Sequence, residues 1–104
     1  MSSPTQRTLA HLRKQGYLVA ITEKWNPWAK IRQDLFGIVD VLAVREGETL
    51  AVQCTSGDNV SKRVAKIAES ETVPMLRKAG WKIVVHGWRK GANGRWALRE
   101  IDCS

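Results

Sequence analysis

Two polar residues, Asp40 and Gln53, interrupt apolar stretches of the sequence that have the pattern of neighbouring strands. Asp40 lies within residues 37–44, GIVDVLAV, and Gln53 lies within residues 49–55, TLAVQCT. An ionised carboxylate inside an apolar strand is costly unless it is paired or coordinated. A carboxylate and an amide oxygen that lie together form part of a site for a hard cation such as Mg²⁺ or Mn²⁺. The structural alternative is that Asp40 accepts backbone N–H bonds or forms a buried ion pair with Arg63.

The turn between these two strands decides whether the side chains meet. If residues 46–47 form a two-residue loop, the register places Asp40 opposite Gln53. A four-residue loop of residues 45–48 gives the same register, whereas a three-residue loop would turn Gln53 to the other face. Side chains that are directly opposite have their β-carbons about 4.5–5.5 Å apart. We therefore expect Asp40, Gln53 and Thr55 to share one face of a sheet.

Capping residues, prolines and glycines along the chain predict the helices and strands that must position Asp40 and Gln53. Ser3, Pro4 and Gly16 mark the beginning and the end of a first helix. Residues 26–33 have the composition of a loop, because Asn-Pro opens a turn. We expect strands at residues 17–25, 37–44, 49–55, 81–88 and 95–101, and helices at residues 60–69 and 73–79. This mixed order predicts an α/β fold around a mixed sheet.

The length and the charge of the chain limit its architecture and its partners. The sequence has 104 residues, which suits a single domain over residues 1–104. A formal charge of +7 favours polyanions, nucleic acid first, although a merely soluble basic surface has the same composition. No apolar run is long enough to cross a bilayer. We therefore expect no membrane partner. Two cysteines do not make a disulfide framework, so we also expect reduced thiols and a cytoplasmic location.

Basic and aromatic residues gather in two predicted loops. A tryptophan exposed on a loop can stack on an unpaired base, and lysine and arginine contact phosphates. Such contacts recognise backbone and shape rather than sequence, which suits branched or flexible DNA. The strand residues Trp81, Trp88 and Trp96 are expected to pack within the protein instead. With Lys62 of the second predicted helix included, the residues predicted to bind nucleic acid are Lys24, Trp25, Trp28, Lys30, Arg32, Lys62, Arg89, Lys90 and Arg95.

The predicted order of helix, three strands, helix and strand resembles the PD-(D/E)xK nuclease-like superfamily. The resemblance covers most of residues 5–88 and rests on GIVD at residues 37–40, QCTS at residues 53–56 and the helix-to-strand segment at residues 77–88. Small members include Holliday-junction resolvases of archaeal type and the VRR-NUC domains of phage and repair proteins. The resemblance implies a three-layer αβββαβ restriction-endonuclease-like core with a mixed sheet, here followed by an extra C-terminal strand.

The sequence departs from the family pattern at both residues of the third-strand motif. Gln53 stands where the family usually has an acid, and Thr55 stands where it has a lysine. An amide oxygen can still bind a hard cation, but without charge. A basic residue of the following helix would replace the charge of the lysine, and the helical positions make Arg63 the best placed, with Lys66 second. Asp34 is the candidate for a second acid, with an ordinary turn residue as the alternative.

The resemblance implies a metal-dependent endonuclease that hydrolyses DNA phosphodiester bonds, on branched DNA as in the resolvases. The implied metal is Mg²⁺ or Mn²⁺, bound by Asp40, Gln53 and Asp34. The implied catalytic residues are Asp40, Gln53, Thr55, Arg63 and Lys66. A homodimer and a phage or mobile-element origin are also implied. The main alternative, favoured by Thr55, is a degenerate member that binds DNA or a partner without cleaving it, and a protein–protein adaptor with incidental charge is a third possibility.

Overall fold

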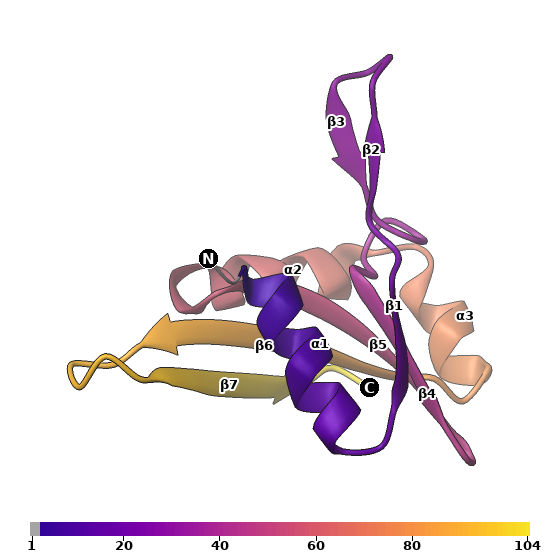
Figure 1. Ribbon diagram of the computed structural model, residues 1–104. Helices are drawn as coiled ribbons and strands as arrows, with labels where there is room; N and C mark the ends of the chain where they lie inside the picture. The colour runs from indigo at the N-terminus through magenta and orange to yellow at the C-terminus, as the bar shows by residue number, and fades with distance from the viewer. Residues whose placement is uncertain (1–2) are drawn as a thin grey trace.

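A mixed sheet is the frame of the molecule, which a computed structural model describes over residues 3–104 (Figure 1). The elements in chain order are α1 (Pro4–Lys14), β1 (Leu18–Ile21), β2 (Lys24–Asn26), β3 (Ile31–Gln33), β4 (Val41–Arg45), β5 (Glu48–Ser56), the 3₁₀ turn η1 (Gly57–Asn59), α2 (Val60–Glu69), α3 (Val73–Lys78), β6 (Lys82–Lys90) and β7 (Trp96–Asp102). Five strands form the sheet in the order β1–β4–β5–β6–β7. β5 and β6 are parallel, and the other neighbours are antiparallel. The predicted α/β class with a mixed sheet is confirmed.

The helices cover both faces of the sheet (Figure 1). On one face, Leu12 of α1 packs in a cluster with Val52 of β5. On the other face, Ile67 of α2 and Leu76 of α3 pack in a cluster with Ala51 of β5. Because neighbouring residues of a strand point to opposite faces, β5 contributes to both cores. Among the described residues, none of the helices is long and apolar enough to span a membrane.

The ends of α1 and α2 lie at the capping and turn residues that the sequence predicts. Ser3 Oγ accepts a hydrogen bond from the backbone N–H of Gln6 at 3.2 Å, and Gly16 follows α1 with a φ of 89°. α2 begins directly after Asn59 and ends at residue 69, as predicted. The side chain of Asn59 does not cap the helix, however, because it donates a hydrogen bond to Ser56 Oγ at 3.0 Å.

The β4–β5 hairpin has the predicted register. Residues 46–47 form the loop, and Val41 pairs with Val52. The regular pairing ends there, because the backbone N–H of Asp40 also donates to the carbonyl of Val52, at 2.9 Å. Asp40 and Val41 thus both face Val52, as in a β-bulge, and the predicted register does not extend to the acid. The predicted contact between Asp40 and Gln53 is nevertheless present, since Gln53 Nε2 donates to Asp40 Oδ2 at 2.7 Å.

The loop predicted at residues 26–33 is wrong. Those residues include the end of β2 and the whole of β3, which pair as a two-stranded hairpin that projects from the sheet (Figure 1). The single strand predicted at residues 17–25 is accordingly divided between β1 and β2. Both strands of the hairpin have three residues and are largely exposed, so they show no alternation of buried and polar residues that would reveal a strand.

The strand predicted at residues 37–44 begins too early, because its first residues form a tight turn. Residues 36–37 both have a positive φ, of 54° and 78°. Across them, Leu35 and Val39 exchange two backbone hydrogen bonds. β4 therefore begins one residue after Asp40, and Asp40 lies at the buried end of this turn instead of inside the strand.

Candidate metal centre

Three carboxylates meet where the β2–β3 hairpin joins the sheet. Glu23, Asp34 and Asp40 each offer a ligand oxygen, and these oxygens all lie within 4.8 Å of one another. Glu23 precedes β2 and Asp34 follows β3, so continuing the hairpin register by one residue places these two acids opposite each other. Like charges in that position destabilise a pair of strands. Arg32 and Lys66 pair with Glu23 and Asp34 and balance part of this charge, and a proton or a further cation would balance the rest.

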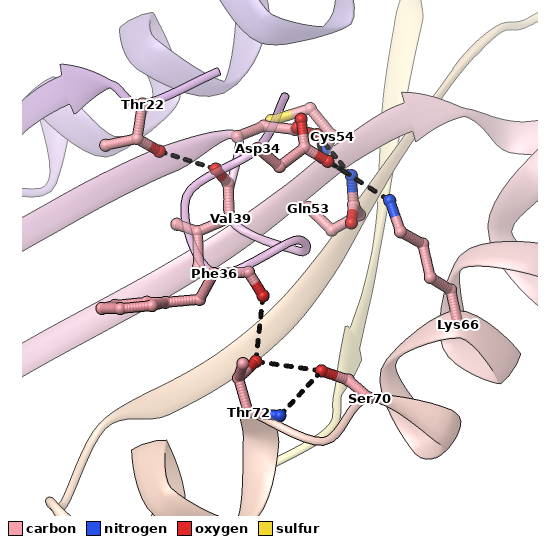
Figure 2. A network of polar contacts seen from close by, with 10 residues as sticks. Thr22, Asp34, Phe36, Val39, Gln53, Cys54, Lys66, Ser70 and Thr72 are labelled. Atoms are coloured by element: carbon pink, nitrogen blue, oxygen red, sulfur yellow. Dashed lines mark hydrogen bonds and ion pairs between the residues drawn. The ribbon is translucent and has the colours of Figure 1, made fainter. Parts of the chain in front are cut away.

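The turn between Asp34 and Asp40 is held from two sides (Figure 2). Thr22, which follows β1, donates a hydrogen bond from Oγ1 to the carbonyl of Val39 at 2.7 Å. Thr72, which precedes α3, donates from Oγ1 to the carbonyl of Phe36 at 2.9 Å. These two hydroxyl groups fix the path of the turn, and through it the positions of both acids.

Asp40 is buried, with 4% of its surface exposed. Its Oδ2 accepts hydrogen bonds from Gln53 Nε2 at 2.7 Å and from the backbone N–H of Cys54 at 2.8 Å. Burial nevertheless raises the pKa of Asp40 from 3.8 to about 7, and the neighbouring Asp34 and Glu23 add to the rise, whereas the N–H of Cys54 opposes it. Near neutral pH the cluster therefore readily takes up a proton, and a divalent cation would compete for the same position.

Gln53 presents its amide nitrogen, not its oxygen, to the acids. Nε2 lies 2.7 Å from Asp40 Oδ2 and 3.5 Å from Asp34 Oδ2. The amide oxygen, Oε1, is buried without a hydrogen-bond partner among residues 3–104. An unpartnered buried acceptor costs about 1–3 kcal/mol. A half-turn of the amide group would exchange the two atoms and bring the oxygen to the carboxylates, where it would be a ligand for a cation.

Basic side chains line a cavity of about 570 Å³ over the acids. Lys66 of α2 reaches toward the cluster, and its Nζ lies 3.3 Å from Asp34 Oδ2 (Figure 2). Arg63 of α2 and Arg32 of β3 line the same cavity, and Arg32 forms an ion pair with Glu23 at 3.2 Å. The cavity thus combines oxygen ligands for a cation with positive groups that can bind a phosphate.

The structure brings together some of the predicted site residues and separates others. Gln53 contacts both Asp40 and Asp34, Lys66 contacts Asp34, and Arg63 borders the same cavity. Thr55 is buried on β5 and makes no hydrogen bond with the cluster among the described residues. The other predicted nucleic-acid contacts, Lys62, Arg89, Lys90 and Arg95, are exposed but line none of this cavity.

Glu23 is the site residue that the sequence pattern did not reveal. It lies at the end of an apparent single strand, TEKW, and only the pairing of β2 with β3 brings it to Asp34. The available signal was the pair of acids that flanks residues 24–33, a segment with basic but no acidic residues. Recognising that segment as a hairpin would have placed Glu23 and Asp34 side by side.

The tryptophans divide only partly as the sequence predicts, because Trp96, expected to pack within the protein, is 41% exposed. Trp88 is buried, and its Nε1 donates a hydrogen bond to Thr8 Oγ1 at 2.9 Å. Trp96 lies under the guanidinium of Arg7, whose Cζ is 3.9 Å from the ring centroid. Trp25 and Trp28, by contrast, are exposed on the β2–β3 hairpin. That hairpin and the β6–β7 hairpin extend from different ends of the molecule (Figure 1).

No protein-family model matches the chain, and a search of curated proteins finds none that is similar to it in sequence. The geometry of the carboxylate cluster and its cavity is consequently the main guide to function.

Proposed function

We propose that the protein is a metal-dependent endonuclease that hydrolyses DNA phosphodiester bonds. The observation that carries the proposal is the group of Glu23, Asp34 and Asp40, with ligand oxygens within 4.8 Å, beneath a cavity that Arg63 and Lys66 line. Carboxylates that bind Mg²⁺ or Mn²⁺, with basic groups beside them, are what phosphodiester hydrolysis at a metal requires. The net charge of +7 supports a polyanionic substrate.

The order of elements supports a three-layer restriction-endonuclease-like core. With the β2–β3 hairpin and the short helix α3 regarded as insertions, α1 is followed by β1, β4, β5, α2 and β6, and β6 lies parallel to β5. This is the αβββαβ order of the PD-(D/E)xK nucleases, with β7 as the extra C-terminal strand. In that comparison Asp40 and Gln53 take the positions of the two acids.

The residues present fit a hard divalent cation. Three carboxylates and the orphaned Oε1 of Gln53 form an oxygen-rich set, and the unpartnered oxygen gives a reason for the amide to turn when a cation binds. Asp40, Asp34, Glu23 and Gln53 would hold Mg²⁺ or Mn²⁺. When bound, such an ion polarises the phosphate and lowers the pKa of an attacking water.

Lys66 and Arg63 of α2 provide the positive charge that the family lysine would provide at the position of Thr55. Lys66 already lies beside Asp34, so its ammonium group can balance negative charge on the phosphate near the cluster. Arg63 lines the same cavity and can bind phosphate oxygens, but it cannot act as a base near neutral pH. We assign Lys66 and Arg63 to stabilisation of the transition state.

A cleavage assay tests this function. Linear, flapped and four-way DNA are incubated with the protein and Mn²⁺, Mg²⁺ or EDTA. Cleavage is expected only with the metal ions, and Asp40→Ala should reduce its rate by more than the about 10- to 100-fold that loss of an outer-shell partner costs. Asp58→Ala is the matched control, because Asp58 is exposed on η1, outside the cavity. Cleavage by Asp40→Ala at the wild-type rate would contradict the assignment.

A binding protein without activity is the second candidate function. Thr55 in the place of the family lysine favours it, as does the amide nitrogen of Gln53 that faces the acids. A gel shift with DNA, together with no cleavage of any substrate in Mn²⁺, would support this candidate. The preference for branched DNA and the homodimer stay predictions that the same substrates and a measurement of molecular mass in solution would test.

A further inference from the structure

The β2–β3 hairpin exposes aromatic and basic side chains at the edge of the candidate metal centre. Trp28 at its tip is 94% exposed, and Trp25 is 57% exposed. Residues 24–33 also contain Lys24, Lys30 and Arg32 and no acid. Exposed apolar side chains that gather on one element, here Trp25, Trp28 and Ile31, indicate a binding surface, and the basic residues around them indicate an anionic partner.

The tip holds Trp28 in a defined position. Asn26 Oδ1 accepts hydrogen bonds from the backbone N–H groups of Trp28 and Ala29, at 3.0 Å and 3.2 Å. Pro27 between them has a restricted φ. Binding through a segment that is already ordered loses less conformational entropy than binding through a flexible loop. The backbone that carries the exposed ring of Trp28 is therefore ordered before a ligand binds.

One face of the hairpin leads from this tip to the cavity. Trp25 pairs with Arg32 across the hairpin, so their side chains share a face. Arg32 lines the cavity and contacts Glu23 of the carboxylate cluster. A chain that lies along this face would meet an indole and a guanidinium before it reaches the acids.

We infer that the hairpin binds an unpaired nucleotide of the nucleic-acid substrate, with its base stacked on Trp28 and the neighbouring phosphates on Lys30 and Arg32. This inference deepens the proposed nuclease function and rests on it. Stacking on an indole requires a base with an open face, which the interior of a duplex does not offer. The substrate class is thus DNA with an unpaired segment at the cleavage site, a flap, a loop or a splayed junction.

Binding measured in EDTA tests the inference separately from cleavage. Fluorescently labelled blunt duplex and the same duplex with a single-stranded flap are titrated with wild type, Trp28→Ala and Trp28→Phe. Trp28→Ala should weaken flap binding by about 5- to 150-fold, the range for one stacked base, and leave duplex binding within about twofold. Trp28→Phe should restore part of the loss, because its ring still stacks. Met75→Ala, which removes another exposed apolar side chain, on α3, is the control and should change neither.

Three results would overturn the inference. One is equal flap affinity in wild type and Trp28→Ala, and another is equal weakening for flap and duplex. The third is Trp28-dependent binding to vesicles of anionic lipid without selective flap binding, which would make the hairpin a membrane contact. A protein that cleaves DNA through Asp40 but shows none of the flap preference keeps the proposed function and loses only this inference. A protein that prefers the flap through Trp28 but cleaves no DNA keeps the nucleotide contact and loses the proposed nuclease function.

Discussion

Asp40 connects the stability of the protein to the chemistry of its candidate site. Its pKa rises from 3.8 to about 7, mainly because the carboxyl group is buried. Between these two pH values the folded protein holds a proton that the unfolded chain releases. The free energy of unfolding therefore falls as the pH rises through this window. A divalent cation that replaces the proton would return the lost stability at neutral pH.

Replacing Asp40 with asparagine is expected to reduce this pH dependence. In EDTA, the free energy of unfolding of wild type should decrease from pH 3.8 to about pH 7 by more than that of Asp40→Asn. His86 has a lowered pKa, mainly through burial, so its contribution is lost as the pH falls below its unfolded value. The contribution of His86 therefore changes with pH in the direction opposite to that of Asp40, and it is the same in wild type and in Asp40→Asn. Urea unfolding at a series of pH values measures the difference, and equal slopes would mean that burial does not raise the pKa of Asp40.

Among the elements, α2 must lie close to the sheet for Lys66 to reach Asp34. Gly87 of β6 permits this approach, because a β-carbon at that position would clash with Cγ2 of Val60, the first residue of α2. The absence of a side chain at position 87 thus determines the distance between helix and sheet at the beginning of α2.

Gly87→Ala tests this packing. We expect it to lower the free energy of unfolding by about 1–3 kcal/mol, the usual effect of overpacking. In a chain that also carries Val60→Ala, the same substitution should cost less, because the clashing methyl group is gone. Chemical denaturation of the four proteins measures the coupling. Additive effects would show that Gly87 and Val60 do not limit the position of α2.

The elements with strong local signals were predictable from the sequence. α1 has a side-chain cap, α1 and α2 both have apolar residues at helical spacing, and the short turn at residues 46–47 sets the register of β4 and β5. The β2–β3 hairpin has no such signal, because its strands are short and bury little surface. The tight turn before β4 was also missed, because positive φ at Phe36 is rare for a residue that is not glycine.

The candidate site was predictable to the extent that it depends on these local signals. The hairpin register brought Asp40 and Gln53 near each other, although it ends one residue before the acid. The face of α2 favoured Arg63 over Lys66, whereas it is Lys66 that forms the ion pair with Asp34. Glu23 could not be found, since it needs the register of the hairpin that the sequence concealed. The orientation of the Gln53 amide also depends on the positions of two carboxylates, which no periodicity describes.

For the molecule as a whole, a net charge of +7 surrounds a local concentration of negative charge. The overall field attracts a polyanion, whereas Glu23, Asp34 and Asp40 repel each phosphate that approaches them. A divalent cation resolves this conflict, because it neutralises the cluster and binds phosphate oxygens at the same time. Occupation of the cluster by a cation is therefore the central claim of the proposed function.

Calorimetric titration with Mn²⁺ near neutral pH tests that claim most directly. Wild type and Asp58→Asn are predicted to show the same saturable binding, with release of protons because Asp40 must ionise to bind the metal. Asp40→Asn is predicted to lose it. The absence of saturable Mn²⁺ binding to the wild-type protein, or unchanged binding to Asp40→Asn, would contradict a metal centre at this cluster.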